Sequence, residues 1–253
     1  MLTIRNDQLD VFKETALKRF EDEMVEHVKT FFPAHYISMQ EKNLRATVQY
    51  GYAKAKTYGV ISIRNVCLYL NNMLLLGSNF DEDPQYPWAK QILAEKNEPD
   101  FNRTMDELSG KMMVQLGEIT GLGNMIIYRA ILNFTKNSNE IFTRLTASDL
   151  SKALHHLNLL FKQKYEVVGE ANLKEMIACG IPSAKKYGIT DEGYLVVYIV
   201  FMFMLGSGFD RDPQFPWAAV ILQDVALDQQ QKTAILYKTA IANLDKVLSQ
   251  NSN

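Results

Sequence analysis

The sequence predicts an all-α fold of two tandem helical repeats, with about five helices each, packed as one body with pseudo-twofold symmetry. Three observations predict it. Residues 43–93 and 172–222 align without a gap at an offset of 129, with 22 identities in 51 positions. Apolar residues recur at three- and four-residue spacing, which is typical of amphipathic helices. No segment alternates apolar and polar residues with period two over a strand length.

The same offset continues beyond the aligned block. Upstream, His27, Phe32 and Tyr36 recur as identical residues 129 positions later, and downstream the segments 101–116 and 230–245 both look helical. A sequence repeat of this length indicates that one structural unit occurs twice in the chain. We therefore expect a first helical repeat at residues 1–129 and a second at residues 130–253.

The first helix of the first repeat begins near Asn6 and Asp7, whose side chains can cap free backbone amides, and stops before Pro33. Its apolar stripe consists of Leu9, Phe12, Ala16, Phe20, Met24, Val28 and Phe31. The spacing predicts a second helix from about Glu41 to Tyr58, ended by Gly59 as a left-handed C-terminal residue.

Ser62 is the expected N-cap of a third helix, 63–76, which Gly77 closes. A short fourth helix is expected at Trp88–Ala94, and a fifth at Asp100–Leu116.

The second repeat follows the same plan, with stops at Gly188 and Gly206, and its last helix is expected at Asp228–Ser249. Residues 146–149 read Thr-Ala-Ser-Asp, a capping-box pattern that predicts a break in the first helix of this repeat. Residues 117–124 are expected to form a short flexible turn between the repeats.

The longest apolar run, 195–205, is well short of the ~20 residues that span a bilayer. We interpret 194–205 as a central core helix. The alternative is that its aromatic and Met side chains carry a small apolar ligand.

Charge and cysteine content narrow the class of protein. The 253 residues include 27 Lys and Arg against 29 Asp and Glu, a net charge of −2. This balance argues against a partner that is nucleic acid or an anionic membrane. Two cysteines, Cys67 and Cys179, fit a reducing compartment, where each would be a small buried hydrophobe. Without a secretory signal at the N-terminus, we expect a cytoplasmic protein with no membrane insertion.

The most specific local feature is a loop that occurs twice, as GSNFDEDPQYPWA at 77–89 and as GSGFDRDPQFPWA at 206–218. The structural interpretation is a helix corner. Phe80 anchors the chain after the helix end, Asp81 or Asp83 caps the amides of the next helix, and Trp88 pins the corner.

The functional interpretation is that the two loops display carboxylates and aromatic rings to a protein partner. The candidate partner-binding residues are Asp81, Asp83, Tyr86, Trp88, Asp210, Asp212, Phe215 and Trp217. The Asp-x-Asp spacing resembles the start of a calcium loop, but the Gly of the tight turn and the distal Glu are absent. We therefore expect no metal and no cofactor.

Other candidate chemistry is weak. Residues 23–27, EMVEH, have Met where a di-iron Glu-x-x-His motif needs Glu, and the second repeat lacks both carboxylates. No nucleophile elbow, phosphate loop or His-Glu-x-x-His motif occurs. The sequence predicts no catalytic residue. The cations of the second helices are expected to be solvated and to offset the helix dipole. They are Lys54, Lys56, Lys185 and Lys186.

Four segments together carry a family resemblance. They are residues 19–27 (RFEDEMVEH), Phe32-Pro33, Tyr58-Gly59 and the FDxDPxxPWA loop. The pattern resembles small uncharacterised all-helical bacterial proteins encoded beside type VI secretion effectors and polymorphic toxins. The resemblance implies an accessory role, either as an immunity protein that occludes a toxin or as an adaptor that loads one.

We therefore expect a non-enzymatic protein-binding accessory protein that acts by steric occlusion of a cognate toxin, or as an effector adaptor or chaperone of type VI secretion. Two alternatives stay open. One is the carrier of a small apolar ligand. The other is an enzyme whose acids, Asp81, Asp83, Asp210 and Asp212, assemble only in three dimensions.

Overall fold

Helices account for the secondary structure of both halves of the chain. The computed structural model describes residues 6–94 and 101–250, and these residues contain α-helices and short 3-10 turns but no strand. The all-α prediction is confirmed. The elements up to residue 120 are α1 (Asn6–Phe31), α2 (Pro33–Thr57), α3 (Ile63–Leu76), η1 (Phe80–Glu82), α4 (Pro87–Ala94) and α5 (Phe101–Thr120).

The chain then continues through a join and a second series of helices. The join consists of η2 (Leu122–Asn124) and α6 (Met125–Lys136), and the expected boundary between residues 129 and 130 lies inside α6. The later elements are α7 (Ser138–Thr146), η3 (Leu150–Lys152), α8 (Ala153–Leu160), α9 (Lys162–Val168), α10 (Glu170–Lys185), α11 (Glu192–Leu205), η4 (Phe209–Arg211), α12 (Pro216–Gln223) and α13 (Gln229–Gln250).

Three pairs of elements begin and end 129 residues apart: α3 with α11, η1 with η4, and α4 with α12. The ends of α3 follow the expected local chemistry. Ser62 accepts a hydrogen bond from the amide of Asn65, and Gly77 ends the helix with φ of 99°. Gly206 ends α11 in the same conformation, with φ of 101°.

The first helices of the two halves differ, as the sequence predicts. Where α1 is continuous, the second half has α7, which ends at Thr146, and α8, which begins at Ala153. The capping box itself does not form, because the Thr146 hydroxyl bonds to the carbonyl of Phe142 and Asp149 makes no side-chain cap. The predicted break is therefore present without its predicted cap.

Two helix boundaries differ from the sequence prediction. Helix α2 begins at Pro33 instead of Glu41, because residues 33–39 form a helical segment before the non-helical Gln40. Helix α5 continues to Thr120 instead of ending at Leu116, so half of the expected turn at 117–124 is helical. Its expected first residue, Asp100, lies outside the described residues.

The apolar core forms two clusters of buried side chains. One lies between Phe20 and Met112 in the sequence, and the other between Phe134 and Ala240. Helix α11 is the centre of the second cluster, with buried side chains at every position from 195 to 203. The interpretation of this helix as a core helix agrees with its burial.

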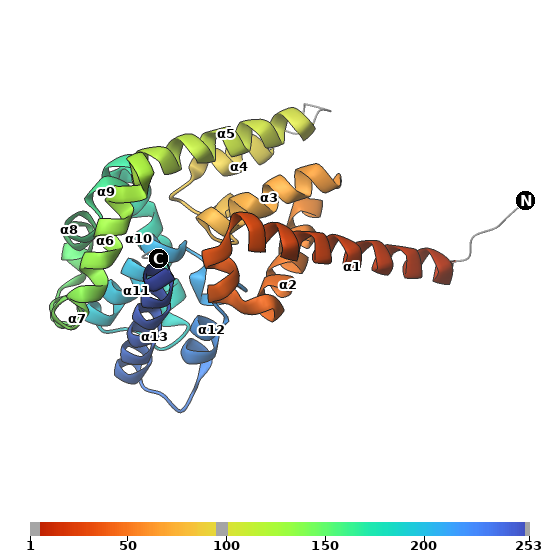
Figure 1. Cartoon of the computed structure of the whole chain (residues 1–253). Coiled ribbons are helices and arrows are strands. Elements are labelled where there is room, and N and C mark those ends of the chain that lie inside the picture. Colours follow the sequence, from red (N-terminus) through yellow and green to blue (C-terminus); the bar gives the residue numbers. More distant parts are fainter. Residues whose placement is uncertain (1–5, 95–100, 251–253) are drawn as a thin grey trace, which may run out of the picture.

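The two series of helices contact each other directly. Helix α5 contacts α9 of the second series, and α13 contacts α2 of the first. Figure 1 shows α5 crossing to the α6 side of the molecule, while the first part of α1 extends beyond the other helices. In the described part of the chain, no helix has the length and apolar character that a membrane crossing requires.

Gln40 is a site of backbone strain. It has φ of 61° and ψ of 160°, a region that residues other than Gly rarely adopt, and Gly169 takes the same conformation 129 residues later, with φ of 82° and ψ of 145°. We expect Gln40→Gly to raise the free energy of unfolding by about 1 kcal/mol and Gly169→Gln to lower it by at least as much. Urea denaturation of both variants tests this, and a stabilising Gly169→Gln would contradict it.

Candidate functional site

The two repeated loops meet each other inside the molecule. Their first glycines approach so closely that a Cβ on Gly77 would lie 2.9 Å from the carbonyl oxygen of Leu205, and a Cβ on Gly206 would lie 3.1 Å from that of Leu76. Larger residues could not keep this distance without moving the backbone. We call this contact between residues 77–89 and 206–218 the loop junction.

Asp83 of the first loop is bound by the second loop. Its carboxylate accepts hydrogen bonds from the Ser207 amide at 2.7 Å and from the Ser207 hydroxyl at 2.6 Å. The amide of Gln85 in the same loop donates a further bond at 2.9 Å. A buried carboxylate needs such donors because it has left water.

Asp212 makes the reciprocal set of contacts with the first loop. It accepts from the Ser78 amide at 2.8 Å, from the Ser78 hydroxyl at 2.6 Å, and from the Gln214 amide at 2.8 Å. Every partner lies 129 residues from its counterpart around Asp83. The two loops therefore use the same atoms to hold each other.

Two glutamine side chains extend this reciprocity to the core helices. The Gln85 side-chain amide donates to the carbonyl of Met202 in α11 at 3.0 Å, and that of Gln214 donates to the carbonyl of Met73 in α3 at 2.8 Å. Each of these carbonyls also accepts a hydrogen bond from the glycine amide that follows its helix, Gly206 for Met202 and Gly77 for Met73. The glutamine therefore adds a second donor, and it ties the loop of one half to the core helix of the other.

Burial raises the pKa of both Asp83 and Asp212 above the usual range of a carboxyl group. The hydrogen bonds from Ser207 and Ser78 act in the opposite direction, because they favour the charged form. A nearby cation also opposes the effect of burial, namely Lys164 for Asp83 and Lys54 for Asp212.

Lys164 is a buried lysine next to the junction. Its ammonium nitrogen donates to the carbonyl oxygen of Phe203 in α11 and lies 4.8 Å from the centre of the Phe203 ring. Burial lowers the pKa of Lys164 to about 8, although the charge of Asp83 favours the protonated form. His35 is the residue 129 positions earlier, and burial lowers its pKa as well.

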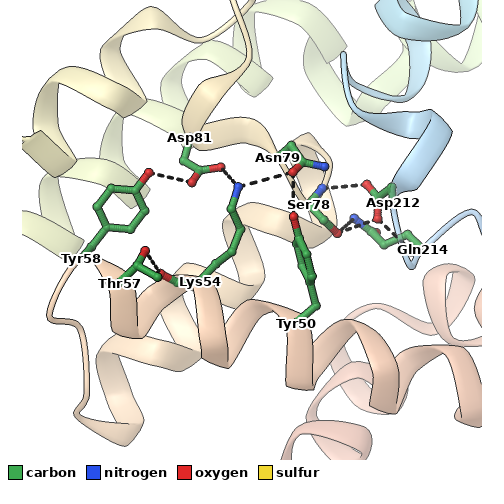
Figure 2. A network of polar contacts seen from close by, with 9 residues as sticks. All are labelled: Tyr50, Lys54, Thr57, Tyr58, Ser78, Asn79, Asp81, Asp212 and Gln214. Carbon is green, nitrogen blue, oxygen red and sulfur yellow. Dashed lines mark hydrogen bonds and ion pairs between the residues drawn. The ribbon is translucent and has the colours of Figure 1, made fainter. Parts of the chain in front are cut away.

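A second polar network flanks the junction in the first half (Figure 2). The Lys54 ammonium lies 2.6 Å from Asp81 Oδ1, and the Tyr58 hydroxyl donates to Asp81 Oδ2 at 2.8 Å. The Tyr50 hydroxyl donates to the Asn79 side-chain oxygen at 2.7 Å. Lys54 and Tyr50 project from α2, so this network ties α2 to the loop.

The corresponding network in the second half keeps the carboxylate but lacks the lysine. Asp210 Oδ2 accepts from the Ser183 hydroxyl at 3.1 Å and from the Tyr187 hydroxyl at 3.0 Å. Ser183 stands where the first half has Lys54. Among the described residues, no ion pair includes Asp210, and its Oδ1 atom is buried without a hydrogen-bond partner.

The structure places the predicted site residues as follows. Five are buried: Asp81, Asp83, Tyr86, Asp210 and Asp212. Three are half-buried: Trp88, Phe215 and Trp217. The four carboxylates lie at or beside the junction, whereas the Trp88 indole donates a hydrogen bond to Gln115 of α5 at 2.6 Å. Partner binding by these residues stays a prediction.

Three sequence expectations about this region need correction. Asp83 bonds to an amide of its own loop and to the other loop, and Asp81 to Lys54 and Tyr58, so these contacts do not cap the next helix. Lys54 is therefore in an ion pair instead of being solvated. Of the two cysteines expected to be buried, Cys67 is half-buried and Cys179 is exposed.

Sequence reasoning missed the residues that complete the junction. They are Ser78, Ser207, Gln85, Gln214 and Lys164. The signal that could have found the first four is their identity in both loops, since small polar residues next to paired Asp residues are donors for buried carboxylates. Lys164 gave no such signal, because its counterpart is His35.

The hydrogen bonds of the junction support a role in holding the fold together more directly than a role in catalysis or metal binding. Within residues 6–94 and 101–250, no group of three or more His, Cys, Asp or Glu side chains could hold a metal ion. Comparisons of the chain with protein-family models, with curated proteins and with solved structures give no match.

Removal of either junction hydroxyl should destabilise the fold. We expect Ser207→Ala to lower the free energy of unfolding by about 1–3 kcal/mol, because Asp83 loses a donor inside the protein. Ser78→Ala should have an effect of similar size through Asp212. The exposed Ser151→Ala is the control and should stay within about 0.5 kcal/mol of wild type. Chemical denaturation measures all three, and junction variants no different from the control would contradict the account.

Lys164 should make stability depend on pH. Its pKa is about 8 in the folded chain and 10.5 as the reference value, so between these values the unfolded chain binds the proton more tightly. The free energy of unfolding should therefore rise by about 2 kcal/mol from pH 8 to pH 10 through this residue. Lys164→Met should lose this rise and the exposed Lys162→Met should keep it, as measured by urea denaturation at each pH. Equal pH slopes in the two variants would disprove it.

Proposed function

We propose that this chain is a non-enzymatic protein-binding accessory protein of the cytoplasm. The particular role we favour is that of an immunity protein that covers the active surface of a cognate toxin, with an effector adaptor or chaperone of type VI secretion as the other form of the same role. The resemblance of residues 19–27 and of the FDxDPxxPWA loop to proteins encoded beside such toxins supports this role.

The observation that carries the proposal is a run of exposed apolar side chains along the join between the two series of helices. We call it the α5–α6 join surface. It comprises Met113, Val114, Leu122, Met125 and Ile126, all of them exposed. Large apolar side chains that gather on a surface are typical of protein interaction sites.

The geometry of the join suits a binding surface. Leu122 is 95% exposed in the short η2 turn, and Met125 and Ile126 follow within one helical turn in α6. Ile126 is held in place, because its side chain folds against Gly121 at a distance that leaves no room for a Cβ there. A supported apolar anchor of this kind loses little conformational entropy when a partner covers it.

The two alternative functions have less support. Helix α11, the candidate carrier of an apolar ligand, has its central residues packed in the core. The four carboxylates of the candidate enzyme are at most 4% exposed, and each accepts hydrogen bonds from neighbouring side chains. Both observations favour roles inside the fold.

The test is co-expression of the chain with the products of neighbouring genes, followed by size-exclusion chromatography. We expect a stable stoichiometric complex with one of them. Leu122→Glu should weaken this complex by tenfold or more, since it places a charge in a desolvated contact worth about 1.4 kcal/mol or more.

The matched control is Val225→Glu, because Val225 is 97% exposed and lies in the turn between α12 and α13, away from the join in the sequence. This variant should bind the partner as wild type does. The absence of any complex, or a complex that Leu122→Glu and Val225→Glu affect equally, would contradict the proposal.

A further inference from the structure

A pocket of about 240 Å³ opens beside the loop junction in the second half. Its lining includes Cys179, Ser183 and the cap residue Lys186 of α10. The two loops add Asn79, Glu82 and Asp83 from the first and Arg211 from the second. The pocket is therefore built by both repeats, at the place where the junction joins them.

The first half shows why there is space here. The positions 129 residues before Cys179 and Ser183 carry Tyr50 and Lys54, two long side chains that reach from α2 across to the loop (Figure 2). Cysteine and serine at these positions are much shorter. The pocket therefore lies beside the part of α10 that carries Cys179 and Ser183. The equivalent part of α2 is covered by the side chains of Tyr50 and Lys54.

The second half nevertheless contains Asp210, the counterpart of the carboxylate that binds the Lys54 ammonium group in the first half. In the first half Lys54 Nζ lies 2.6 Å from Asp81 Oδ1. The equivalent atom, Asp210 Oδ1, is buried and has no hydrogen-bond partner among the residues that the structure describes. Ser183 lines the pocket and donates to the other oxygen of Asp210, so the carboxylate lies directly behind this wall. A buried carboxylate without a cation is costly, and an ammonium ion relieves that cost.

Asn79, which does line the pocket, carries a second unpartnered polar group. The oxygen of the Asn79 side chain accepts from Tyr50 and Lys54, which turns its nitrogen Nδ2 the other way. This nitrogen lies against Gly208, another pocket residue, and is buried without an acceptor in the described part of the chain. Asn79 is 7% exposed, so bulk water does not replace the missing partner.

We propose that this pocket binds a small primary amine that carries an oxygen acceptor, with its ammonium group at Asp210 and its oxygen at Asn79. The ligand then supplies to the second half the ammonium that Lys54 supplies to the first. Lys186 and Arg211 also line the pocket, but both are exposed. The carboxylates of Asp83 in the lining and of Asp210 behind Ser183 are buried, and they favour an ammonium group on the inner side.

Tyramine is the probe, because it joins a phenol and a primary ammonium group in one small molecule. Isothermal titration calorimetry of the full chain with tyramine should show saturable binding at one site. 4-Ethylphenol, which has the ring and the hydroxyl but no nitrogen, should bind about tenfold more weakly or not at all, since a hydrogen bond to a charged group is lost. Equal binding of the two compounds, or no saturable binding of tyramine at millimolar concentration, would overturn the proposal.

Two substitutions place the residues of the first half at the equivalent positions of the second half. Ser183→Lys supplies an internal ammonium to Asp210, and Cys179→Tyr fills the pocket from an exposed position. Each should abolish tyramine binding while circular dichroism shows a folded chain. Cys179→Ser is the matched control, because it changes the same residue and leaves the space open, and it should bind as wild type does. Retained binding in both filled variants would overturn the proposal, and so would loss of binding in Cys179→Ser.

Discussion

Two buried carboxylates, one in each half of the chain, depend on donors that only the other half supplies. Asp83 needs the amide and hydroxyl of Ser207, and Asp212 needs those of Ser78. A carboxylate removed from water without such donors costs several kcal/mol. Separation of the two loops would therefore remove these donors from both carboxylates. The contact also brings the ends of α3 and α11 together, because Gly77 and Gly206 approach each other closely.

The two halves use equivalent hydrogen-bond partners only within the junction itself. The central hydrogen bonds are the same in both directions, but the flanking networks differ, because Lys54 closes one side and Ser183 leaves the other side open. The junction thus leaves two regions available for function. One is the α5–α6 join surface, proposed for a protein partner, and the other is the pocket beside Asp210, proposed for a small amine. The pocket borders the junction, because Asp83 and Ser207 are among the residues that line it.

Much of the fold could be predicted from the sequence, because helix ends are decided locally by residues such as Ser62 and Gly77. The repeat also identified the right loops. The pairing of Asp83 with Ser207 could not be predicted, since an offset within the chain does not say which loop supplies which donor. The pocket was missed for a related reason. Its signal is a difference between the two copies, because the first has Lys54 and the second has Ser183 beside a carboxylate that both contain. Identities between the repeats do not reveal such a difference.

The most direct test of the account is whether the two halves unfold together. The chain contains two tryptophans, Trp88 in the first loop and Trp217 in the second. In the single-tryptophan variants Trp88→Phe and Trp217→Phe, the fluorescence reports one half at a time, and circular dichroism reports all helices. Because the junction joins the halves, the fluorescence and dichroism midpoints in urea should coincide within each variant. A tryptophan signal that changes in a separate transition from the helices would show that the halves are independent and would contradict the account.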